Sequence, residues 1–401
     1  MKVGVLRESR RYHDRRVAIT PETARLIREN YPGVSLFVQS SAVRIHQDEE
    51  YSAMGIPVVN DVSHCDLLIG IKEVSEESLI EGKTYIMFAH VAKQQAFNRS
   101  FFKQMADKKI TLLDYEYFTD QHHNRLVAFG FWAGVVGAYY AFQGAARRFR
   151  GIGLPRPETC RNLRELYHHL RTIKLPPLKI LLTGGGRVAS GALEMIHEMG
   201  IAEVLPKDFL EKDYDHPVYV RLDPEDYVVK KQGKFDRDDF YQNPADYSSA
   251  FLPYLKPTDI FIPCHFWDQV SPHFFTPAQL RSPDFGISLI ADVSCDVPGP
   301  IPTTIRTSSI DNPFYDVDPE SLLEQPAFSS SAHITVMAVD NLPTALPFDA
   351  SRTFARDLYH QVLPSLFGED TEGIIERATI LKDGQLTEQF SYLRDFLEGE
   401  T

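Results

Sequence analysis

The sequence predicts an α/β protein of two domains, each built on a mostly parallel β-sheet. Three observations support this fold class: the length of 401 residues, the alternation of short apolar runs with helical patterns, and a glycine-rich turn between a predicted strand and a predicted helix. A chain of this length is too long for one ordinary hydrophobic core, so two domains are expected.

The first part of the chain alternates between predicted strands and helices. It opens with an apolar run at residues 2–6, and a helical pattern follows over residues 20–27. Thr20 is placed to act as the N-cap of this helix, and Pro21 suits its first position. Strands separated by helices are typical of a parallel sheet. Further short buried strands are predicted at residues 35–38, 67–71 and 85–88.

A second alternating block follows a proline-rich stretch. Its first strand is predicted at residues 178–182, and a helix is predicted over residues 191–199. Later strands of the same sheet are expected at residues 260–262 and 287–291. The segment at residues 213–247 is highly charged and poor in apolar residues, so we expect it to be a surface excursion.

The glycine-rich turn of this block has the pattern of a dinucleotide-binding motif. Gly184, Gly186 and Ala189 fit G-x-G-x-x-A between an apolar strand and an amphipathic helix. The first glycine allows the tight turn, the second lets the backbone approach a pyrophosphate, and the small third residue allows close packing. The helix N-terminus then holds the phosphates through its N–H groups and dipole. The cofactor-binding residues predicted here are Gly184, Gly185, Gly186, Arg187 and Val188; a purely structural turn is the alternative.

An acidic residue that binds the cofactor ribose should follow the second strand of this block, predicted at residues 202–205. Asp208 is the best candidate, because its carboxylate would accept hydrogen bonds from the ribose hydroxyls and repel a 2′-phosphate. Lys207 beside it could instead attract that phosphate. NAD is therefore favoured as the cofactor, with NADP possible.

The domain boundaries follow from this organisation. Residues 136–329 are expected to form the Rossmann-like dinucleotide-binding domain, and residues 1–135 with 330–401 the substrate and catalytic domain. The end of the chain, with a strand-like run at residues 334–338 and a helical tail, is too small for a core of its own. We therefore expect it to return to the first domain, with the active site in the cleft between two Rossmann-like domains.

Side chains suited to proton transfer follow two predicted strands of the first domain. Hydride transfer from a C–N or C–O carbon needs a second group that takes or gives a proton. Lys72 and Glu73 follow one strand, and His90 follows the next. Because the carboxyl ends of parallel strands face the ligand crevice, these residues are acid–base candidates. A solvated strand end and a packing histidine are the alternatives.

Other charged residues suit substrate binding. Arg16 and Arg125 could grip substrate carboxylates through paired hydrogen bonds. Asp114 and Glu116 lie two residues apart, so on a strand they would share one face, and burial of that face would require partners for both.

Charge and cysteine content limit the possible partners and compartment. The 55 acidic and 42 basic residues give a formal charge of −13, which argues against binding to nucleic acid or an anionic membrane. The uncharged stretch at residues 127–146 is rich in glycine and alanine, so a buried helix explains it better than a membrane span. No signal peptide is expected. Four scattered cysteines indicate free thiols in a reduced, cytoplasmic protein: Cys65, Cys160, Cys264 and Cys295.

Eight segments, taken together, resemble the lysine-forming saccharopine dehydrogenases and the related lysine–ketoglutarate reductase domains. They span nearly the whole chain, at residues 6–8, 16–21, 70–73, 88–93, 113–116, 125–134, 290–296 and 339–347. Alanine dehydrogenase and the soluble part of transhydrogenase are more distant members of the same fold group.

The resemblance implies an NAD(P)-dependent dehydrogenase that acts on a CH–NH group. Such enzymes oxidise saccharopine to an imine, which water hydrolyses to lysine and 2-oxoglutarate, or they run the reverse reaction. The substrate is thus a small amino-acid-like molecule; the sequence does not predict an oligomeric state. By matching position, the resemblance implies that Lys72 and His90 form an acid–base pair whose pKa values are tuned by Glu73 and Glu116. It also implies that Arg16 and Arg125 contact the substrate. Asp292 would lie near the nicotinamide.

The cofactor half departs from the family pattern. Ala189 replaces the family's third glycine, Thr183 stands at its first, and the segment at residues 213–247 is longer than expected. An enzyme similar to alanine dehydrogenase, which releases ammonia, and a non-catalytic metabolite-binding homologue are the alternative interpretations. Saccharopine has three carboxylates and needs several cationic contacts, whereas a small amino acid needs one.

Overall fold

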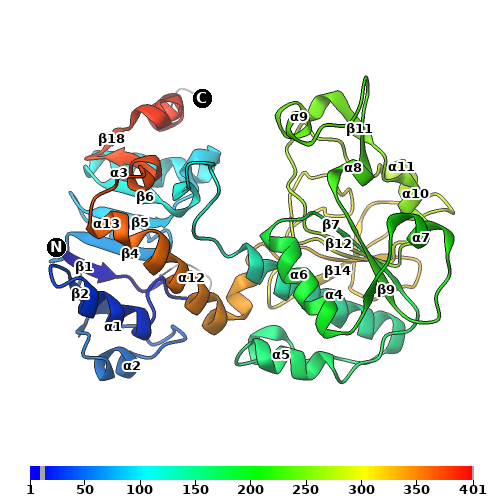
Figure 1. Cartoon of the computed structure of the whole chain (residues 1–401), viewed down its shortest axis with the longest axis horizontal. Coiled ribbons are helices and arrows are strands. Elements are labelled where there is room, and N and C mark those ends of the chain that lie inside the picture. The colour runs from blue at the N-terminus through cyan, green and yellow to red at the C-terminus, as the bar shows by residue number, and fades with distance from the viewer. Residues whose placement is uncertain (10–13, 400–401) are drawn as a thin grey trace. The chain divides into compact units, whose positions relative to one another are not determined.

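The computed structural model describes residues 1–9 and 14–399, and the chain divides into two compact units (Figure 1). The first unit joins Met1–Phe129 with Pro347–Thr401, so the blue and the orange-to-red ends of the chain share it; the second is Gly130–Leu346. Each unit contains an eight-stranded sheet in which parallel pairs predominate. The predicted α/β class is confirmed.

The sheet of the first unit is parallel except at one edge. The strand at residues 379–382, which the chain forms after it returns from the second unit, pairs antiparallel with both of its neighbours at that edge. In spatial order the strands are β18 (Gln385–Leu386), β17 (Thr379–Lys382), β6 (Thr111–Asp114), β5 (Thr84–Phe88), β4 (Leu67–Lys72), β1 (Lys2–Val5), β2 (Ser35–Gln39) and β3 (Val58–Val59).

Hydrophobic cores cover both faces of this sheet. Leu67 and Ile69 of β4 pack in one core, and Leu68 between them packs in the other, because successive side chains of a strand point to opposite faces. Thr20 caps the first helix as predicted: its hydroxyl accepts a hydrogen bond from the backbone N–H of Thr23 at 3.3 Å. The helices of the unit are α1 (Pro21–Asn30), α2 (Asp48–Ala53), α3 (Arg99–Asp107), α12 (Pro347–Gln361), α13 (Leu363–Phe367), α14 (Ile374–Ala378) and α15 (Arg394–Glu398).

The second sheet is also parallel apart from two strands at one edge. Its spatial order is β15 (Glu324–Gln325), β14 (Phe314–Val317), β16 (Ile334–Met337), β13 (Leu289–Ala291), β12 (Ile260–Pro263), β7 (Lys179–Thr183), β9 (Val218–Leu222) and β8 (Ala202–Glu203). A separate two-stranded antiparallel sheet pairs β10 (Val228–Lys230) with β11 (Tyr247–Ser249). The helices are α4 (Gly130–Arg150), α5 (Leu163–Leu170), α6 (Arg187–Glu198), α7 (Pro206–Glu211), α8 (Pro224–Tyr227), α9 (Arg237–Gln242), α10 (Leu252–Leu255) and α11 (Pro277–Leu280).

Two expectations about this unit differ from the structure. The charged segment at residues 213–247 is not a surface excursion throughout, because it contains β9, which lies beside β7 within the sheet. β9 has only five residues and charged neighbours, so the average hydropathy of the segment concealed it. The run at residues 334–338 does not return to the first unit either, because β16 pairs with β13 and β14.

The boundaries between the units move accordingly. The first boundary lies after Phe129, where the sequence predicted it after residue 135. The second lies after Leu346, where the sequence predicted it after residue 329. The first boundary coincides with the start of α4, and the second directly precedes α12.

Two glycines allow α4 and α6 to pack backbone against backbone (Figure 1). A Cβ atom on Gly134 would lie 1.8 Å from the carbonyl oxygen of Val188, and one on Gly191 would lie 1.9 Å from that of Phe131. The stretch expected to be a buried helix is α4, whose side chains are mostly buried. Among the described residues, no helix has the length and apolar character needed to cross a membrane.

This packing predicts that alanine at either glycine destabilises the protein. In a helix, glycine to alanine ordinarily raises the free energy of unfolding by about 1 kcal/mol. Here the overlap with a backbone oxygen should reverse the sign, so that Gly134→Ala and Gly191→Ala each lower it by about 1–3 kcal/mol. Gly153→Ala, whose Cβ would meet no atom within 4 Å, is the control in urea unfolding. Unchanged or increased stability of the two helix variants would contradict the close packing.

Candidate active site

The carboxyl ends of β4, β5 and β6 bring the predicted acid–base residues together. Lys72 is the last residue of β4, His90 follows β5 by two residues, and Glu116 follows β6 by two. The Nζ of Lys72 lies 3.1 Å from Nε2 of His90, and Nδ1 of His90 lies 3.7 Å from Oε2 of Glu116. Glu73, the next residue after Lys72, is buried with 3% of its surface exposed.

The contact between Lys72 and His90 limits how the pair can hold protons. Two positively charged groups at 3.1 Å repel each other, so the contact is a hydrogen bond only when one nitrogen offers its lone pair. One side chain then acts as acid while the other acts as base. This is the arrangement that a two-step proton transfer requires.

Glu116 supplies a negative charge beside the pair. Burial alone raises the pKa of Glu116, but contact with His90 and the charges of Arg125 and Lys93 outweigh burial and lower it to about 2. Its Oε1 lies 3.2 Å from Nη2 of Arg125 and 4.0 Å from Nζ of Lys93. Glu116 is therefore ionised at neutral pH, and it stabilises positive charge on His90.

A buried carboxylate fixes the backbone around His90. Asp114 accepts hydrogen bonds from the N–H groups of Ala89, His90 and Glu116 at 3.0, 3.2 and 2.9 Å. Burial raises the pKa of Asp114 to about 6. His90 itself is in the left-handed region, with φ at 54°. Because Asp114 ends β6 and Glu116 lies in a short 3-10 helix, Tyr115–Tyr117, the two do not share the face of one strand.

Glu8 also belongs to this group, although the sequence did not predict it as a site residue. Its carboxylate accepts hydrogen bonds from the N–H groups of Ile71 and Lys72 at 2.7 and 2.9 Å. Burial and the charge of Asp14 raise the pKa of Glu8 to about 7. Glu8 lies three residues after β1, which pairs in parallel with β4. Its position shortly after a predicted strand is the sequence feature that could have identified it.

The two arginines expected to bind substrate differ in exposure. Arg16 has 2% of its surface exposed, and its guanidinium lies over the Phe129 ring at 4.3 Å. Its Nε and Nη2 donate to the two carboxylate oxygens of Asp14 at 3.0 and 2.6 Å. Burial opposes the ionisation of Asp14, but Arg16 outweighs this effect and lowers the pKa of Asp14. Arg125 is 49% exposed.

The second unit contains the predicted glycine turn in the expected setting, between β7 and α6. Gly184 has φ at +98°, and a Cβ there would lie 2.6 Å from the carbonyl oxygen of Cys264, so only glycine fits. Gly186 is the N-cap of α6, and a Cβ on it would meet no atom within 4 Å. Gly185, Gly186 and Arg187 are exposed, whereas Ala189 is fully buried. The backbone at the start of α6 is therefore accessible to an anionic ligand.

The structure does not support Asp208 as the acidic residue at the end of the second strand. The strand beside β7 is β9, whereas β8 is an edge strand, and Asp208 lies in α7, 3.0 Å from Lys212. Asp223 directly follows β9 instead, and a Cβ on Gly185 would lie 3.2 Å from its carboxylate. Arg221 pairs with Asp223 at 2.7 Å. Sequence order misled the prediction because β9 was not recognised.

Two other residues follow strands of this sheet. Asp292 is fully buried after β13, and its carboxylate accepts from Thr304 and from Ser294 and Cys295, so it holds the local loop. His265 follows β12, and its Nδ1 lies 3.0 Å from the hydroxyl oxygen of Thr183. Burial lowers the pKa of His265 to about 3, and its Nε2 has no hydrogen-bond partner among the described residues. The position after a strand, which identified His90, could have identified His265.

Known proteins resemble the chain in sequence and in fold. Residues 4–136 match the protein family described as "Alanine dehydrogenase/PNT, N-terminal domain". The chain is 29% identical to an alpha-aminoadipic semialdehyde synthase of Arabidopsis thaliana, over 98% of the chain and 41% of that protein. It is 29% identical to a "Saccharopine dehydrogenase [NAD(+), L-lysine-forming]" of Yarrowia lipolytica, over 92% of the chain and 94% of that protein.

The chain thus spans less than half the length of the alpha-aminoadipic semialdehyde synthases that it matches. Among solved structures, an L-alanine dehydrogenase covers 100% of the chain and is itself covered completely, with a TM-score of 0.64 and 16% identity. A transhydrogenase from Sinorhizobium meliloti has a TM-score of 0.56 and 14% identity, over 96% of this chain and 99% of that one. These structural similarities confirm the fold.

The resemblance inferred from the sequence motifs is therefore confirmed: residues 4–136 match the alanine dehydrogenase/PNT N-terminal domain, and nearly the whole chain is similar to the lysine-forming saccharopine dehydrogenases and to part of the alpha-aminoadipic semialdehyde synthases.

Proposed function

We propose that the protein is a nicotinamide-dependent oxidoreductase that interconverts saccharopine with lysine and 2-oxoglutarate. The observation that carries the proposal is the hydrogen-bond contact of 3.1 Å between Lys72 and His90, beside the ionised Glu116. The similarity to saccharopine dehydrogenases over about nine-tenths of both chains supports the substrate. The similarity to L-alanine dehydrogenase is at 16% identity and supports the fold alone.

The pair supplies the proton transfers of such a reaction. In the oxidative direction, one member of the pair takes the proton from the secondary amine of the substrate as its carbon loses hydride. The other member then removes a proton from the water that attacks the imine carbon, and the first member returns its proton to the nitrogen. As the C–N bond breaks, the hydroxyl proton passes through the pair to the leaving amine, so the pair never carries two positive charges. The reverse reaction uses the same steps in the opposite order. Glu116 stabilises the positive charge on the pair at each step. When bound, the nicotinamide cofactor supplies the hydride acceptor or donor.

Substrate carboxylates are assigned to the exposed cations of the same group. Arg125 and Lys93 are about half exposed, and both contact Glu116. Arg16 is buried and paired with Asp14, so its contribution is to hold Asp14 in place. Glu8 and Asp114 are positioning residues, because they bind backbone N–H groups of Lys72 and His90. Glu73 is buried and directly follows Lys72 in the chain, and the role proposed for it is to tune the pKa of the acid–base pair.

The glycine turn fits the phosphates of a dinucleotide, and we propose that NAD is preferred over NADP. The left-handed Gly184, the open space at Gly186 and the exposed start of α6 are the features that a pyrophosphate needs. Asp223, at the end of the strand beside β7, replaces Asp208 as the proposed ribose-binding residue. Its carboxylate neutralises Arg221, which would otherwise attract a 2′-phosphate.

Replacement of His90 should remove turnover. NADH and NADPH oxidation is followed by absorbance with lysine plus 2-oxoglutarate and, separately, with pyruvate plus ammonia. We expect turnover with the first pair only, and a loss of about 10²–10⁴-fold in kcat for His90→Ala. His122→Ala, in an exposed loop of the same unit, is the control. Turnover only with pyruvate and ammonia would reject the saccharopine assignment, and full activity of His90→Ala would reject the acid–base pair.

A side chain at Gly186 should block the cofactor without harming the fold. Gly186→Val places methyl groups where a pyrophosphate would approach the backbone, in space that the protein leaves open. We expect NADH, titrated by fluorescence, to bind at least about 10-fold more weakly, which is about 1.4 kcal/mol. The melting temperature of Gly186→Val should be no lower than that of Gly153→Val, a control with equally open surroundings. Unchanged affinity would show that the turn is structural only.

Replacement of Asp223 should relax the choice of cofactor. Asp223→Ser keeps an N-cap for α8 but removes the charge that neutralises Arg221. We expect the ratio of kcat/KM for NADPH to that for NADH to rise by about 10-fold or more, equivalent to about 1.4 kcal/mol. Asp208→Ser should leave the ratio unchanged. The opposite pattern, with an effect only at Asp208, would restore the assignment made from the sequence.

A further inference from the structure

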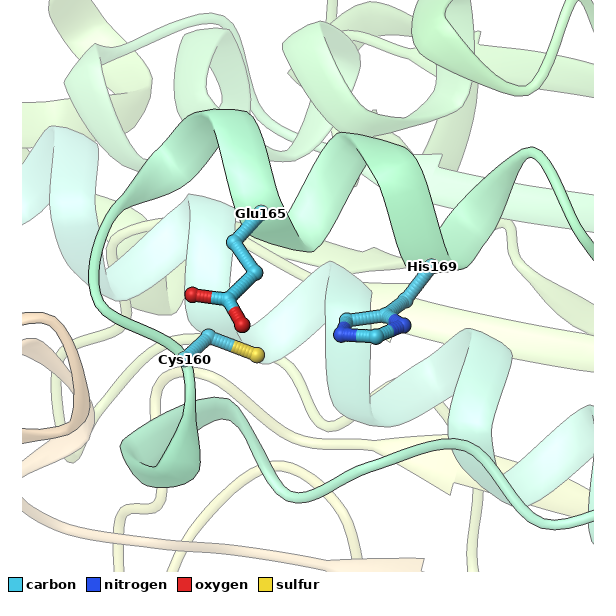
Figure 2. Close-up of side chains that lie close together, drawn as sticks. All are labelled: Cys160, Glu165 and His169. Atoms are coloured by element: carbon cyan, nitrogen blue, oxygen red, sulfur yellow. The ribbon is translucent and has the colours of Figure 1, made fainter.

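Three potential metal ligands of the second unit converge, and none of them belongs to either group of residues described above. Cys160 precedes α5, and Glu165 and His169 lie on α5. Figure 2 shows the thiol, the carboxylate and the imidazole turned toward a common point, with the carboxylate and ring reaching from the helix to the cysteine segment. From this geometry we propose that Cys160, Glu165 and His169 bind a zinc ion.

Local structure holds the three side chains in this arrangement. Glu165 and His169 are four residues apart, so they lie one turn apart on the same face of α5. The side chain of Asn162 caps the helix and accepts from the N–H of Glu165 at 3.2 Å. Glu165 in turn accepts from the N–H of Arg161 at 2.6 Å, which draws the cysteine segment toward the helix.

The distances suit a small cation after minor side-chain rotation. One donor atom from each residue lies within 4.8 Å of the other two. Zinc bonds a thiolate at about 2.3 Å and a ring nitrogen or carboxylate oxygen at about 2.0–2.2 Å. Among the described residues, no other three histidine, cysteine, aspartate or glutamate side chains bring their donor atoms this close together.

The donor set favours zinc over the hard cations. Thiolate and imidazole are poor ligands for magnesium and calcium, which prefer oxygen, whereas zinc accepts sulfur, nitrogen and oxygen together. Three protein ligands leave one tetrahedral position for a water molecule or another small ligand. The bound ion would connect the segment at Cys160 to α5, because its ligands come from both.

Charge around the thiol favours a cation as well. The carboxylates of Glu165 and Glu158 place negative charge beside the Cys160 thiol. Arg156, four residues before Cys160, is paired with Glu158 and Asp311. Zinc would replace the thiol proton: the S–H bond breaks, a zinc–sulfur bond forms, and the proton passes to solvent.

The test is a cobalt titration of the full chain after removal of metal by a chelator, with a phosphine as reductant. Cobalt reports a thiolate ligand by a charge-transfer band in the near ultraviolet and tetrahedral geometry by visible bands. We expect both bands, saturation at one cobalt per chain, and their loss on addition of zinc. Near neutral pH, zinc binding should release about one proton per ion, since a cysteine thiol is ordinarily protonated at that pH.

Variants assign the bands to the three residues. Cys160→Ser should abolish the charge-transfer band, and Glu165→Gln and His169→Asn should weaken zinc binding by at least about 10-fold in competition with a chromogenic chelator. His168→Ala, at an exposed neighbouring position of α5, should bind as the wild type does, and so should Cys295→Ser. Circular dichroism without metal establishes that each variant is folded.

The proposal would be overturned by a wild-type protein that gives no thiolate band with cobalt, whatever the variants do. It would also be overturned by a band that survives Cys160→Ser or disappears in Cys295→Ser, because the thiolate ligand would then lie elsewhere. If Cys160→Ser does not fold, the two helix variants decide, since their substitutions change only partly exposed side chains. None of these measurements depends on catalytic activity or on the proposed substrate.

Discussion

The carboxylate of Asp114 connects two of the chain segments on which the proposed chemistry depends, the one at His90 and the one at Glu116. It is fully buried at the end of β6 and accepts N–H groups from Ala89, His90 and Glu116. Satisfying these donors holds His90 in its left-handed conformation, at a cost that the surrounding bonds offset. The ring of His90 then reaches both Lys72 and Glu116. A loss of the Asp114 bonds would leave buried N–H groups unpaired, which costs about 1–3 kcal/mol for each group.

The buried acids of this region have different environments and therefore different protonation. Glu116 faces His90 and the cations Arg125 and Lys93, so it is ionised in spite of its burial. Asp114 and Glu8 mainly face backbone N–H groups, and burial raises the pKa of each, to about 6 and about 7. The fixed negative charge is thus beside His90, while the other two acids hold the backbone. Neighbouring carboxylates obtain distinct roles from their surroundings alone.

In the second unit, glycines allow backbone atoms to approach each other closely, and these contacts position the helices and the glycine turn. Gly184 accommodates the carbonyl of Cys264, and Gly134 and Gly191 bring α4 against α6. Gly186 differs from these, because the space around its Cα is open. The first three glycines are explained by packing. Of these four glycines, Gly186 is the one that packing does not explain, which is why its replacement separates cofactor binding from stability.

The sequence by itself determined the fold class, the glycine turn and the positions of Lys72 and His90 after their strands. Strand periodicity and chain direction are local properties, and the carboxyl ends of parallel strands lie at one edge wherever the strands are placed.

Only the tertiary structure decided which strands are neighbours. A five-residue strand between charged segments, β9, pairs with β7 and places Asp223 rather than Asp208 at its end, and the pairing of β16 moved a domain boundary. Glu8 and Asp114 obtain their roles from N–H groups that are 24 or more residues away in sequence, apart from that of Glu116. Cys160 meets Glu165 and His169 because of the turn before α5. Such contacts depend on sheet order and chain reversal, which no local pattern of residues encodes.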